Sequence, residues 1–172
     1  RVMARAVSRP VSDYFLALHR RMGTDIHLDT GVTRVRHEGG RAVVDLSDGG
    51  ALDAGAVLIA AGVVPNVELA RDAGLEVGDG IVVDEMLVTS DPAISAIGDC
   101  AFFPNPYAGA SVRLESVQNA NDQARAVAKR LTGSPAPYAN LPWFWSNQGP
   151  ARLQIAGLSA GYDDTVLRGV PA

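Results

Sequence analysis

The residues of this chain best suited to chemistry are a glycine and a carboxylate, Gly98 and Asp99, which follow a short apolar run at residues 94–97. The run predicts a buried strand, and dinucleotide-sized ligands bind where strands of a parallel sheet end. Gly98 lets a ligand approach the backbone, and the Asp99 carboxylate can accept hydrogen bonds from sugar-like hydroxyl groups. The plainer alternative is a strand that ends in an ordinary Asp-capped turn.

The second candidate is the start of a predicted helix, within the sequence from Arg113 to Ala120. Ser116 or Glu115 is expected to begin this helix, and the carboxylate of Glu115 favours its positive end. The free backbone N–H groups near Val117 would then face outward, where they can bind negative charge. An ordinary capped amphipathic helix is the alternative interpretation.

Two further positions could border a flat ligand. Trp145 lies in an aromatic patch at residues 143–145, and its indole combines an apolar body with one N–H donor, which suits the wall of a partly wet pocket. Gly62 ends a continuous apolar run and offers close backbone approach. A core aromatic cluster and a plain strand-to-helix turn are the respective alternatives.

Turn and cap signals divide the chain into short elements. Pro10 suits the start of a helix and Gly23 its end, while Gly39 and Gly40 predict a hairpin turn. In chain order we expect a helix at 11–22, strands at 25–28, 32–37 and 41–46, a buried strand at 56–62, a short helix at 67–73 capped by Asn66, strands at 81–84, 86–89 and 94–97, a loop at 101–113, a helix at 116–131 and a strand at 152–156. One apolar face of the second long helix is expected to hold Val117, Ala120, Ala124, Val127, Ala128 and Leu131.

Strands and helices intermix around a mostly buried sheet, so the fold class is α/β. The Gly133–Pro137 stretch is the clearest linker. We expect three pieces: the C-terminal half of a nucleotide-binding domain at residues 1–65, a second ligand-binding segment at 66–134, and the start of a C-terminal α+β domain at 135–172. The first residue is not methionine and runs directly into helical sequence, which is typical of a piece of a longer protein.

Composition excludes several classes of function. The 172 residues are 47% hydrophobic, which is too apolar for a disordered chain. A net charge of −4 with interleaved signs gives no basic face for nucleic acid. No apolar run is long enough to span a membrane and no secretory signal is present, so a cytoplasmic location is expected. The single cysteine, Cys100, excludes a Cys pair within these residues, and three scattered histidines predict no metal site.

The sequence resembles the bacterial ferredoxin reductase family, which includes putidaredoxin and rubredoxin reductases. The resemblance covers nearly all of the residues, with the motifs in the expected order. The resemblance rests on the segments Ala60–Asn66, Ile97–Cys100, Leu114–Ala120 and Phe144–Ser146. The Gly-Asp motif is shared by a broad superfamily of FAD-dependent pyridine nucleotide oxidoreductases, whereas the Glu-Ser-Val and Phe-Trp-Ser segments are more specific to this branch. The implied fold is Rossmann-like, with two dinucleotide-binding domains.

The resemblance assigns cofactor roles to the candidate residues. Asp99, next to Gly98, would bind the ribityl hydroxyls of FAD, and Val117, behind Glu115 and Ser116, would place a backbone N–H at the flavin pyrimidine. There the positive helix end would stabilise the negative charge of reduced flavin. Trp145 would lie near the isoalloxazine, and Gly62 would lie beside the nicotinamide. Asn147 stands where the family commonly has Asp, which puts an acid role at that position in doubt.

The implied reaction is hydride transfer from NADH to FAD, followed by single-electron transfer to a small iron–sulfur protein, typically a [2Fe–2S] ferredoxin that serves an oxygenase. The cofactor carries this chemistry, so we name no catalytic acid or base. The family's two glycine-rich phosphate motifs and the acidic residue that reads the ribose do not occur in these residues. We therefore expect residues 1–172 alone to be inactive. These residues determine neither the choice between NADH and NADPH nor the oligomeric state.

Two alternatives remain open at this point. One is another flavin reductase of the superfamily, such as an NADH oxidase, a nitrite reductase relative or a disulfide reductase, of which the last needs a Cys pair outside these residues. The other is a non-catalytic nucleotide-binding module that kept the fold and lost the cofactor.

Overall fold

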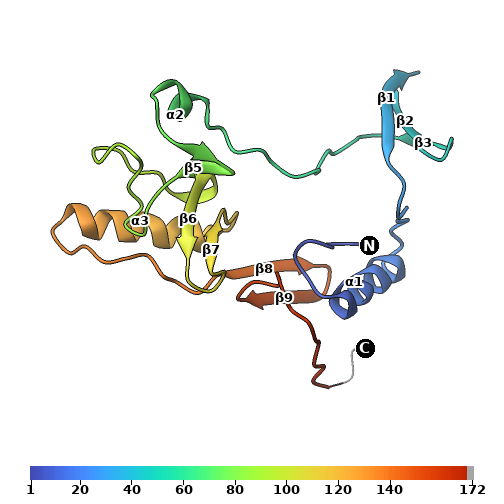
Figure 1. Ribbon diagram of the computed structural model, residues 1–172. Helices are drawn as coiled ribbons and strands as arrows, with labels where there is room; N and C mark the ends of the chain where they lie inside the picture. Colours follow the sequence, from blue (N-terminus) through green and yellow to red (C-terminus); the bar gives the residue numbers. More distant parts are fainter. Residues whose placement is uncertain (170–172) are drawn as a thin grey trace. The chain divides into compact units, whose positions relative to one another are not determined.

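The computed structural model describes residues 1–169, and the chain divides into two compact units. The first unit is made of Arg1–Gly62 together with residues from Tyr162 onward, and the second is Val63–Gly161. Each unit is described by itself below (Figure 1). These two units are defined by compactness and not by which ligand a segment binds. They therefore do not test the predicted three-piece division, which remains a prediction.

Helix α1 (Arg9–Arg21) forms where the sequence predicts it. Pro10 lies in its first turn, where a backbone N–H has no partner within the helix, so the missing N–H of proline costs nothing. Phe15 and Leu18 of this helix are buried. Three basic residues lie in the last turn, where positive charge is stabilised by the negative end of the helix dipole. Gly23 follows with φ +86°, a left-handed conformation that ends helices readily only at glycine.

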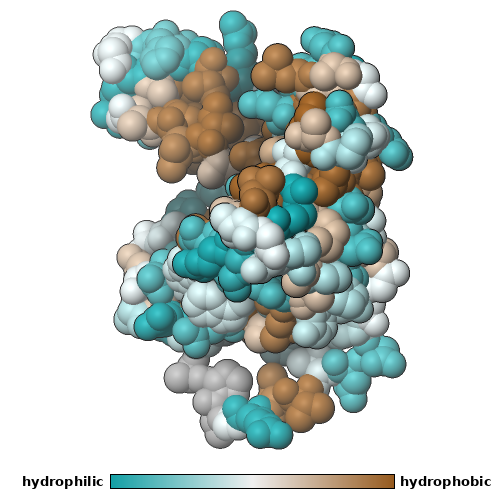
Figure 2. Space-filling view, turned by 90° about the vertical axis from the view of Figure 1, so that its left-hand side faces the viewer, coloured by the Kyte–Doolittle hydropathy of each residue, from teal (hydrophilic) through white to brown (hydrophobic). Residues whose placement is uncertain are grey.

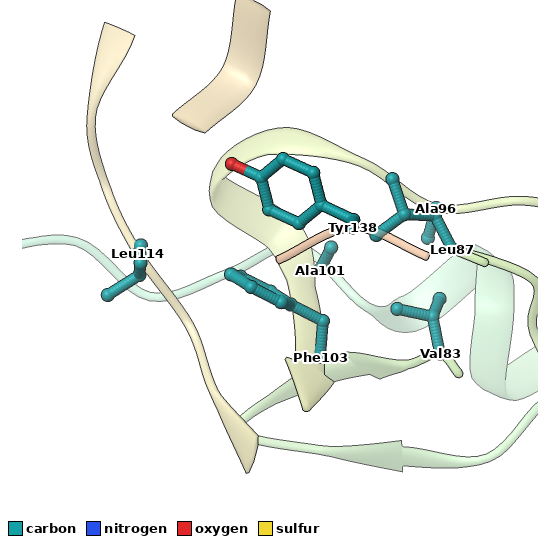
Figure 3. Close-up of a cluster of buried hydrophobic side chains, with 7 residues drawn as sticks. All are labelled: Val83, Leu87, Ala96, Ala101, Phe103, Leu114 and Tyr138. Carbon is teal, nitrogen blue, oxygen red and sulfur yellow. The ribbon is translucent and has the colours of Figure 1, made fainter. Parts of the chain in front are cut away.

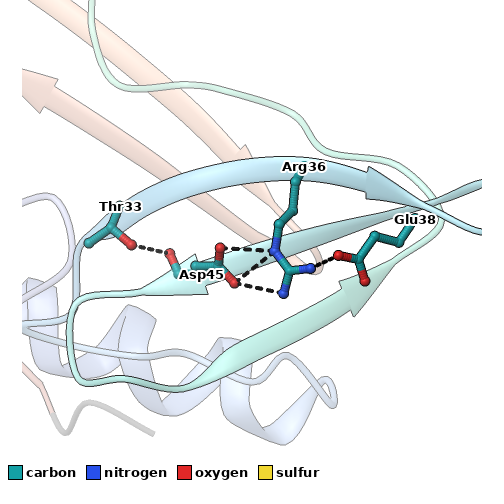
Figure 4. Close-up of polar contacts among 4 residues, drawn as sticks. All are labelled: Thr33, Arg36, Glu38 and Asp45. Carbon is teal, nitrogen blue, oxygen red and sulfur yellow. Dashed lines mark hydrogen bonds and ion pairs between the residues drawn. The ribbon is translucent and has the colours of Figure 1, made fainter.

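A three-stranded antiparallel sheet completes the first unit, in the order β1 (Val32–Glu38), β2 (Arg41–Leu46) and β3 (Ala51–Ala54). Gly39 and Gly40 both have positive φ, which a tight two-residue hairpin requires, so the predicted hairpin is confirmed. Figure 4 shows Arg36 of β1 reaching across to Asp45 of β2, with Nε and Oδ2 3.0 Å apart. The hydrogen bond from Arg36 lowers the pKa of the Asp45 carboxyl group.

Two predicted strands of the first unit are absent. Residues 25–28 are irregular, and residues 56–62 contain no strand. The second segment was expected to be buried, yet Leu58 is 91% exposed and Ile59 is 78% exposed. The physical reason is that a strand needs neighbouring backbone groups, and within residues 1–169 no strand pairs with this segment. Figure 2 shows apolar patches exposed among polar side chains on one face of the molecule.

The second unit contains a four-stranded sheet in the order β4 (Val77–Gly78), β5 (Gly80–Val82), β6 (Ala101–Asn105) and β7 (Ala110–Val112). Strands β5 and β6 are parallel, whereas the β4–β5 and β6–β7 pairs are antiparallel. The expected loop at 101–113 is therefore wrong for most of its length. Asn105 explains the turn between its two strands, because its side-chain oxygen accepts hydrogen bonds from the amides of Tyr107 and Ala108.

Other elements of the second unit follow the sequence more closely. The long helix is α3 (Val117–Leu131), and the hairpin of β8 (Trp143–Gln148) and β9 (Ala151–Ala156) contains the predicted strand at 152–156. The short helix is α2 (Glu68–Asp72), and its N-cap is Val67 rather than the expected Asn66. The predicted strands 86–89 and 94–97 do not form; only an isolated bridge joins Val88 to Ser95.

A compact apolar core supports this sheet and helix (Figure 3). Phe103 is 1% exposed and meets the ring of Tyr138 edge-on, with ring centroids 5.5 Å apart. Leu87 and Ala101 are as deeply buried beside them. The core thus joins β6 to the loop that leads into β8, and it holds the start of β6, directly after the turn that contains Gly98 and Asp99.

Candidate functional site

Gly98 and Asp99 lie in one turn of 3-10 helix, η1 (Gly98–Cys100), directly before β6. Gly98 is buried with φ +75°, and its N–H donates a 2.7 Å hydrogen bond to Oε1 of Gln123 in α3. A Cβ at this position would lie 3.7 Å from the Cβ of Ala120, which is ordinary contact. The turn is therefore held against α3, and its glycine is required by the backbone conformation rather than by lack of space.

This geometry gives a prediction for Gly98→Ala. Because left-handed φ is unfavourable for L-residues with a Cβ, we expect the free energy of unfolding to fall by about 1–2 kcal/mol. Urea unfolding of the natural protein that carries this chain measures the effect. Gly78→Ala is the control, since Gly78 lies in the same unit without positive φ. Equal stability of the Gly98 variant and the natural protein would contradict the argument.

The Asp99 side chain is exposed, and no hydrogen bond from the described residues reaches its carboxylate. Its backbone carbonyl accepts a 3.1 Å hydrogen bond from Nη1 of Arg113. The same Nη1 donates to Glu115 Oε1 over 2.6 Å. The turn that carries Asp99 and the segment that leads into α3 are therefore joined by one side chain, and the carboxylate of Asp99 stays available to a ligand.

Helix α3 begins as predicted, with Ser116 as its N-cap. The Ser116 hydroxyl oxygen accepts a 3.1 Å hydrogen bond from the backbone N–H of Asn119. The first amides of a helix have no partners within it, so the amides of Val117 and Gln118 remain open to a ligand. Val117 is 60% exposed, which leaves the surface at this helix end open to solvent. The carboxylate of Glu115, which was expected to favour the positive end of this helix, forms an ion pair with Arg113.

Trp145 lies in β8, and its ring stacks on Trp143 with centroids 5.0 Å apart. The backbone N–H of Trp143 donates to Oε1 of Gln118, in the first turn of α3. The aromatic pair is thus tied to the same helix end that follows Glu115 and Ser116. Trp145 is 40% exposed, so its ring can contact a bound molecule.

The two most deeply buried residues of α3 are polar, which the apolar pattern did not predict, although Val127 of the expected apolar face does pack against the core. Val117 and Leu131 are exposed, whereas Asn119 and Gln123 are buried. Asn119 donates to the carbonyl of Leu114 and accepts from the Tyr138 hydroxyl, at 3.1 Å each. Sequence reasoning missed these two amides; their four-residue spacing on one helix face was the only signal. It also assigned no role to Arg113, which is close to Asp99 in space but not in sequence.

Burial of Tyr138 makes its phenol sensitive to high pH. Desolvation, with a smaller effect of Asp122, raises the pKa of Tyr138 to about 12, against about 10 in an unfolded chain. The folded state holds the proton more tightly, so this stabilisation is complete below about pH 10 and is lost as pH rises towards 12.

We therefore expect unfolding midpoints in urea to fall more steeply with pH in this range for the natural protein than for Tyr138→Phe, which cannot ionise. The variant will also be less stable at neutral pH, because the buried Asn119 oxygen loses its donor. Parallel pH dependence of the two proteins would contradict the account.

Gly62 closes the first unit, has φ +97°, and is exposed. A Cβ there would lie 3.5 Å from a guanidinium nitrogen of Arg5. The other candidates, Gly98, Asp99, Glu115, Ser116, Val117 and Trp145, all lie in the second unit, where contacts around α3 connect them. No helix in residues 1–169 is long and apolar enough to cross a membrane, and no three potential metal-ligating side chains gather there.

The groups assembled around η1 and α3 suit a neutral or anionic ligand rich in hydroxyl and carbonyl groups. One unpaired carboxylate accepts hydrogen bonds from hydroxyls, while open amides at the helix end donate to carbonyl oxygens or negative charge. A second, buried donor is the Gln123 Nε2 atom, which has no protein partner. The donor and acceptor set fits a flavin with its ribityl chain.

Comparison with known proteins agrees with this chemistry. The sequence matches the pyridine nucleotide-disulphide oxidoreductase family over residues 1–124 and the reductase C-terminal family over residues 143–172. The chain therefore belongs to the pyridine nucleotide-disulphide oxidoreductase family. Membership in that family confirms the predicted fold class, although five of the six strand pairings among the described residues are antiparallel.

Among its relatives, ferredoxin reductases are prominent, so the predicted resemblance is confirmed. Rhodocoxin reductase of Rhodococcus erythropolis is 52% identical over 170 residues, which cover 98% of this chain and 40% of the relative. A ferredoxin reductase from Rhodopseudomonas palustris matches with TM-score 0.95 and 52% identity over 99% of this chain and 43% of that one. The covalent putidaredoxin reductase–putidaredoxin complex matches with TM-score 0.93 and 42% identity over 99% and 42%. The chain thus spans about two fifths of the relatives that it matches.

Proposed function

We propose that this chain is part of an FAD-dependent NADH oxidoreductase that passes electrons to a ferredoxin-type iron–sulfur protein of an oxygenase system. The observation that carries the proposal is the connection of the Asp99 turn to α3: Arg113 links the turn to the segment that enters the helix, and Gln123 links it to the body of the helix. This connection holds a free carboxylate and free helix amides in one neighbourhood, as a flavin with its ribityl chain requires. Family membership and the names of the relatives support the same function.

Each proposed residue has a binding or orienting task. The Asp99 carboxylate accepts hydrogen bonds from ribityl hydroxyls, and Gly98 allows the chain to pass close to the backbone. The amide of Val117, placed by the Ser116 cap and by Glu115, donates to the pyrimidine edge. Trp145 forms an aromatic wall. Bound FAD supplies the capacity to accept hydride and to release electrons one at a time.

The remaining assignments belong to the same proposal. Gly62 would lie beside the nicotinamide of NAD(H), the electron acceptor would be a [2Fe–2S] ferredoxin, and the protein would act in the cytoplasm. Residues 1–65, 66–134 and 135–172 would be the end of the NAD(P)-binding domain, the second FAD-binding segment and the start of the C-terminal domain. No residue is assigned as a catalytic acid or base.

The test is an acceptor comparison with the natural protein that carries this chain. Purified protein receives NADH anaerobically together with a [2Fe–2S] ferredoxin, nitrite or a small disulfide, and in a separate experiment with oxygen alone. We expect fast ferredoxin reduction and slow reactions with the other acceptors. Faster turnover with nitrite, a disulfide or oxygen would replace the proposed acceptor, and a protein that neither binds flavin nor oxidises NADH would be a non-catalytic module.

A further inference from the structure

Arg113 stands apart from the other arginines because it binds three separate parts of the second unit. Its Nε donates to Asp79 Oδ1 over 3.3 Å, in the turn between β4 and β5. Its Nη1 donates to the Asp99 carbonyl and to the Glu115 carboxylate. The side chain is only 11% exposed. One guanidinium therefore links the sheet edge, the Gly-Asp turn and the segment that enters α3.

The surroundings of Arg113 are built around this position. A Cβ on Gly80 would lie 2.7 Å from the carbonyl oxygen of Cys100 and 3.1 Å from Cδ of Arg113, so only glycine allows the close packing. A mostly buried cation needs partners, because leaving it unpaired costs several kcal/mol. The hydrogen bond that Arg113 donates to Glu115 is the largest cause that raises the pKa of Arg113 above its usual range. The guanidinium is thus permanently charged and held.

We propose that Arg113 is a positioning residue for FAD: it fixes the backbone of Asp99 against Glu115 so that the free carboxylate and the α3 amides engage one ligand together. This inference rests on the proposed function and deepens it. Nη1 holds the carbonyl of Asp99 and leaves its carboxylate open. The same atom holds the carboxylate two residues before Val117. Arg113 acts through these groups and not through contact with the cofactor.

A positioning role predicts coupling between Arg113 and Asp99. Arg113→Met removes the hydrogen bonds and keeps an unbranched apolar side chain, so Asp99 becomes free to turn. We expect the FAD dissociation constant of the apo-protein to rise about 10-fold, because the ordering of Asp99 must then occur on binding. In the Asp99→Ala background there is no carboxylate left to position. The same Arg113 change should then have less than about a twofold further effect.

Two variants control for general damage. Arg36→Met removes an arginine of the first unit that also pairs with carboxylates, and it should leave FAD affinity unchanged. Arg113→Lys keeps the charge but lacks the planar fork that binds several acceptors at once, so it should bind FAD with an affinity between those of Met and Arg. If Arg113→Met does not fold, Arg113→Lys carries the same double-mutant comparison.

The measurement is a fluorescence titration of FAD into apo-protein for the natural protein and for each single and double variant. Urea unfolding of each apo-protein runs in parallel. Equal FAD affinity in the Arg113 variants, or a loss that multiplies with that of Asp99→Ala, would overturn the inference while leaving the proposed function standing. A natural protein that binds no FAD would instead overturn the proposed function.

Discussion

Replacing Asp99 with alanine is expected to weaken FAD binding by the natural protein about 100-fold, so that the variant purifies without its yellow colour. The carboxylate is exposed and receives no hydrogen bond from the described residues, so it is available to ribityl hydroxyls. Hydrogen bonds to a charged group contribute about 1.5–3 kcal/mol each, and each 1.4 kcal/mol is a tenfold change in affinity. Two such bonds therefore account for the expected loss.

The dissociation constant of FAD, measured by titration of apo-protein, tests this expectation. Asp99→Asn keeps the shape and one acceptor oxygen but removes the charge, so its loss should be smaller. Asp72→Ala is the matched control, because Asp72 is exposed on α2 and belongs to no candidate site. An Asp99→Ala variant that binds FAD as tightly as the Asp72→Ala variant would show that the carboxylate does not hold the cofactor.

Truncation of Phe103 to alanine should lower the free energy of unfolding by about 3–5 kcal/mol. Phe103 is 1% exposed and packs edge-on against Tyr138, so the deletion leaves a cavity between β6 and the segment before β8 (Figure 3). Urea denaturation of the natural protein measures the change. The unfolding midpoint should fall without a change in slope, which reports loss of stability and not of compactness.

Phe102 provides the matched control, because it neighbours Phe103 in β6 but is only partly buried. Phe102→Ala should therefore destabilise the protein by clearly less than Phe103→Ala. Equal losses at the two positions would mean that the alternating burial along β6 does not describe the packed core.

Local signals in the sequence were sufficient for the elements that local chemistry determines. Pro10 and Gly23 delimit α1, the Gly39–Gly40 pair closes the first hairpin, and Ser116 caps α3. In each case a single residue type satisfies backbone groups or permits a special φ without help from distant residues. These elements therefore appear in the structure within one or two residues of their predicted ends.

Elements that depend on distant partners were not predictable in the same way. Residues 56–62 have the apolar composition of a buried strand, but a strand forms only beside another strand. The stretch at 101–113 is rich in Pro and Gly and was expected to be a loop, yet Phe103 pairs with Val112 and Pro104 with Ser111. Tertiary pairing overrides local propensity in both cases.

The candidate site divides along the same line. Gly98, Asp99 and the start of α3 were identified from residue types and order, and in the structure side-chain hydrogen bonds connect the turn η1 to α3 and to the segment before it. Gln123, which makes part of that connection, was missed because a polar residue on an amphipathic helix is normally expected to face solvent. Arg113, which makes the other part, lies before α3 and meets Asp99 only in the folded chain. Only the folded chain shows that the Gln123 side chain is buried with its Oε1 bonded to Gly98, and that Arg113 is mostly shielded from solvent beside Asp99 and Glu115.

The most direct test of the account is the visible absorption spectrum of the natural protein before and after anaerobic addition of NADH. We predict a yellow protein whose flavin band bleaches when NADH is added, because in the proposed function the Asp99 turn and the start of α3 would bind FAD and the bound FAD would accept hydride from NADH. A colourless protein that releases no flavin on denaturation would contradict the central claim. A flavin band that NADH leaves unchanged would contradict the assignment of the donor.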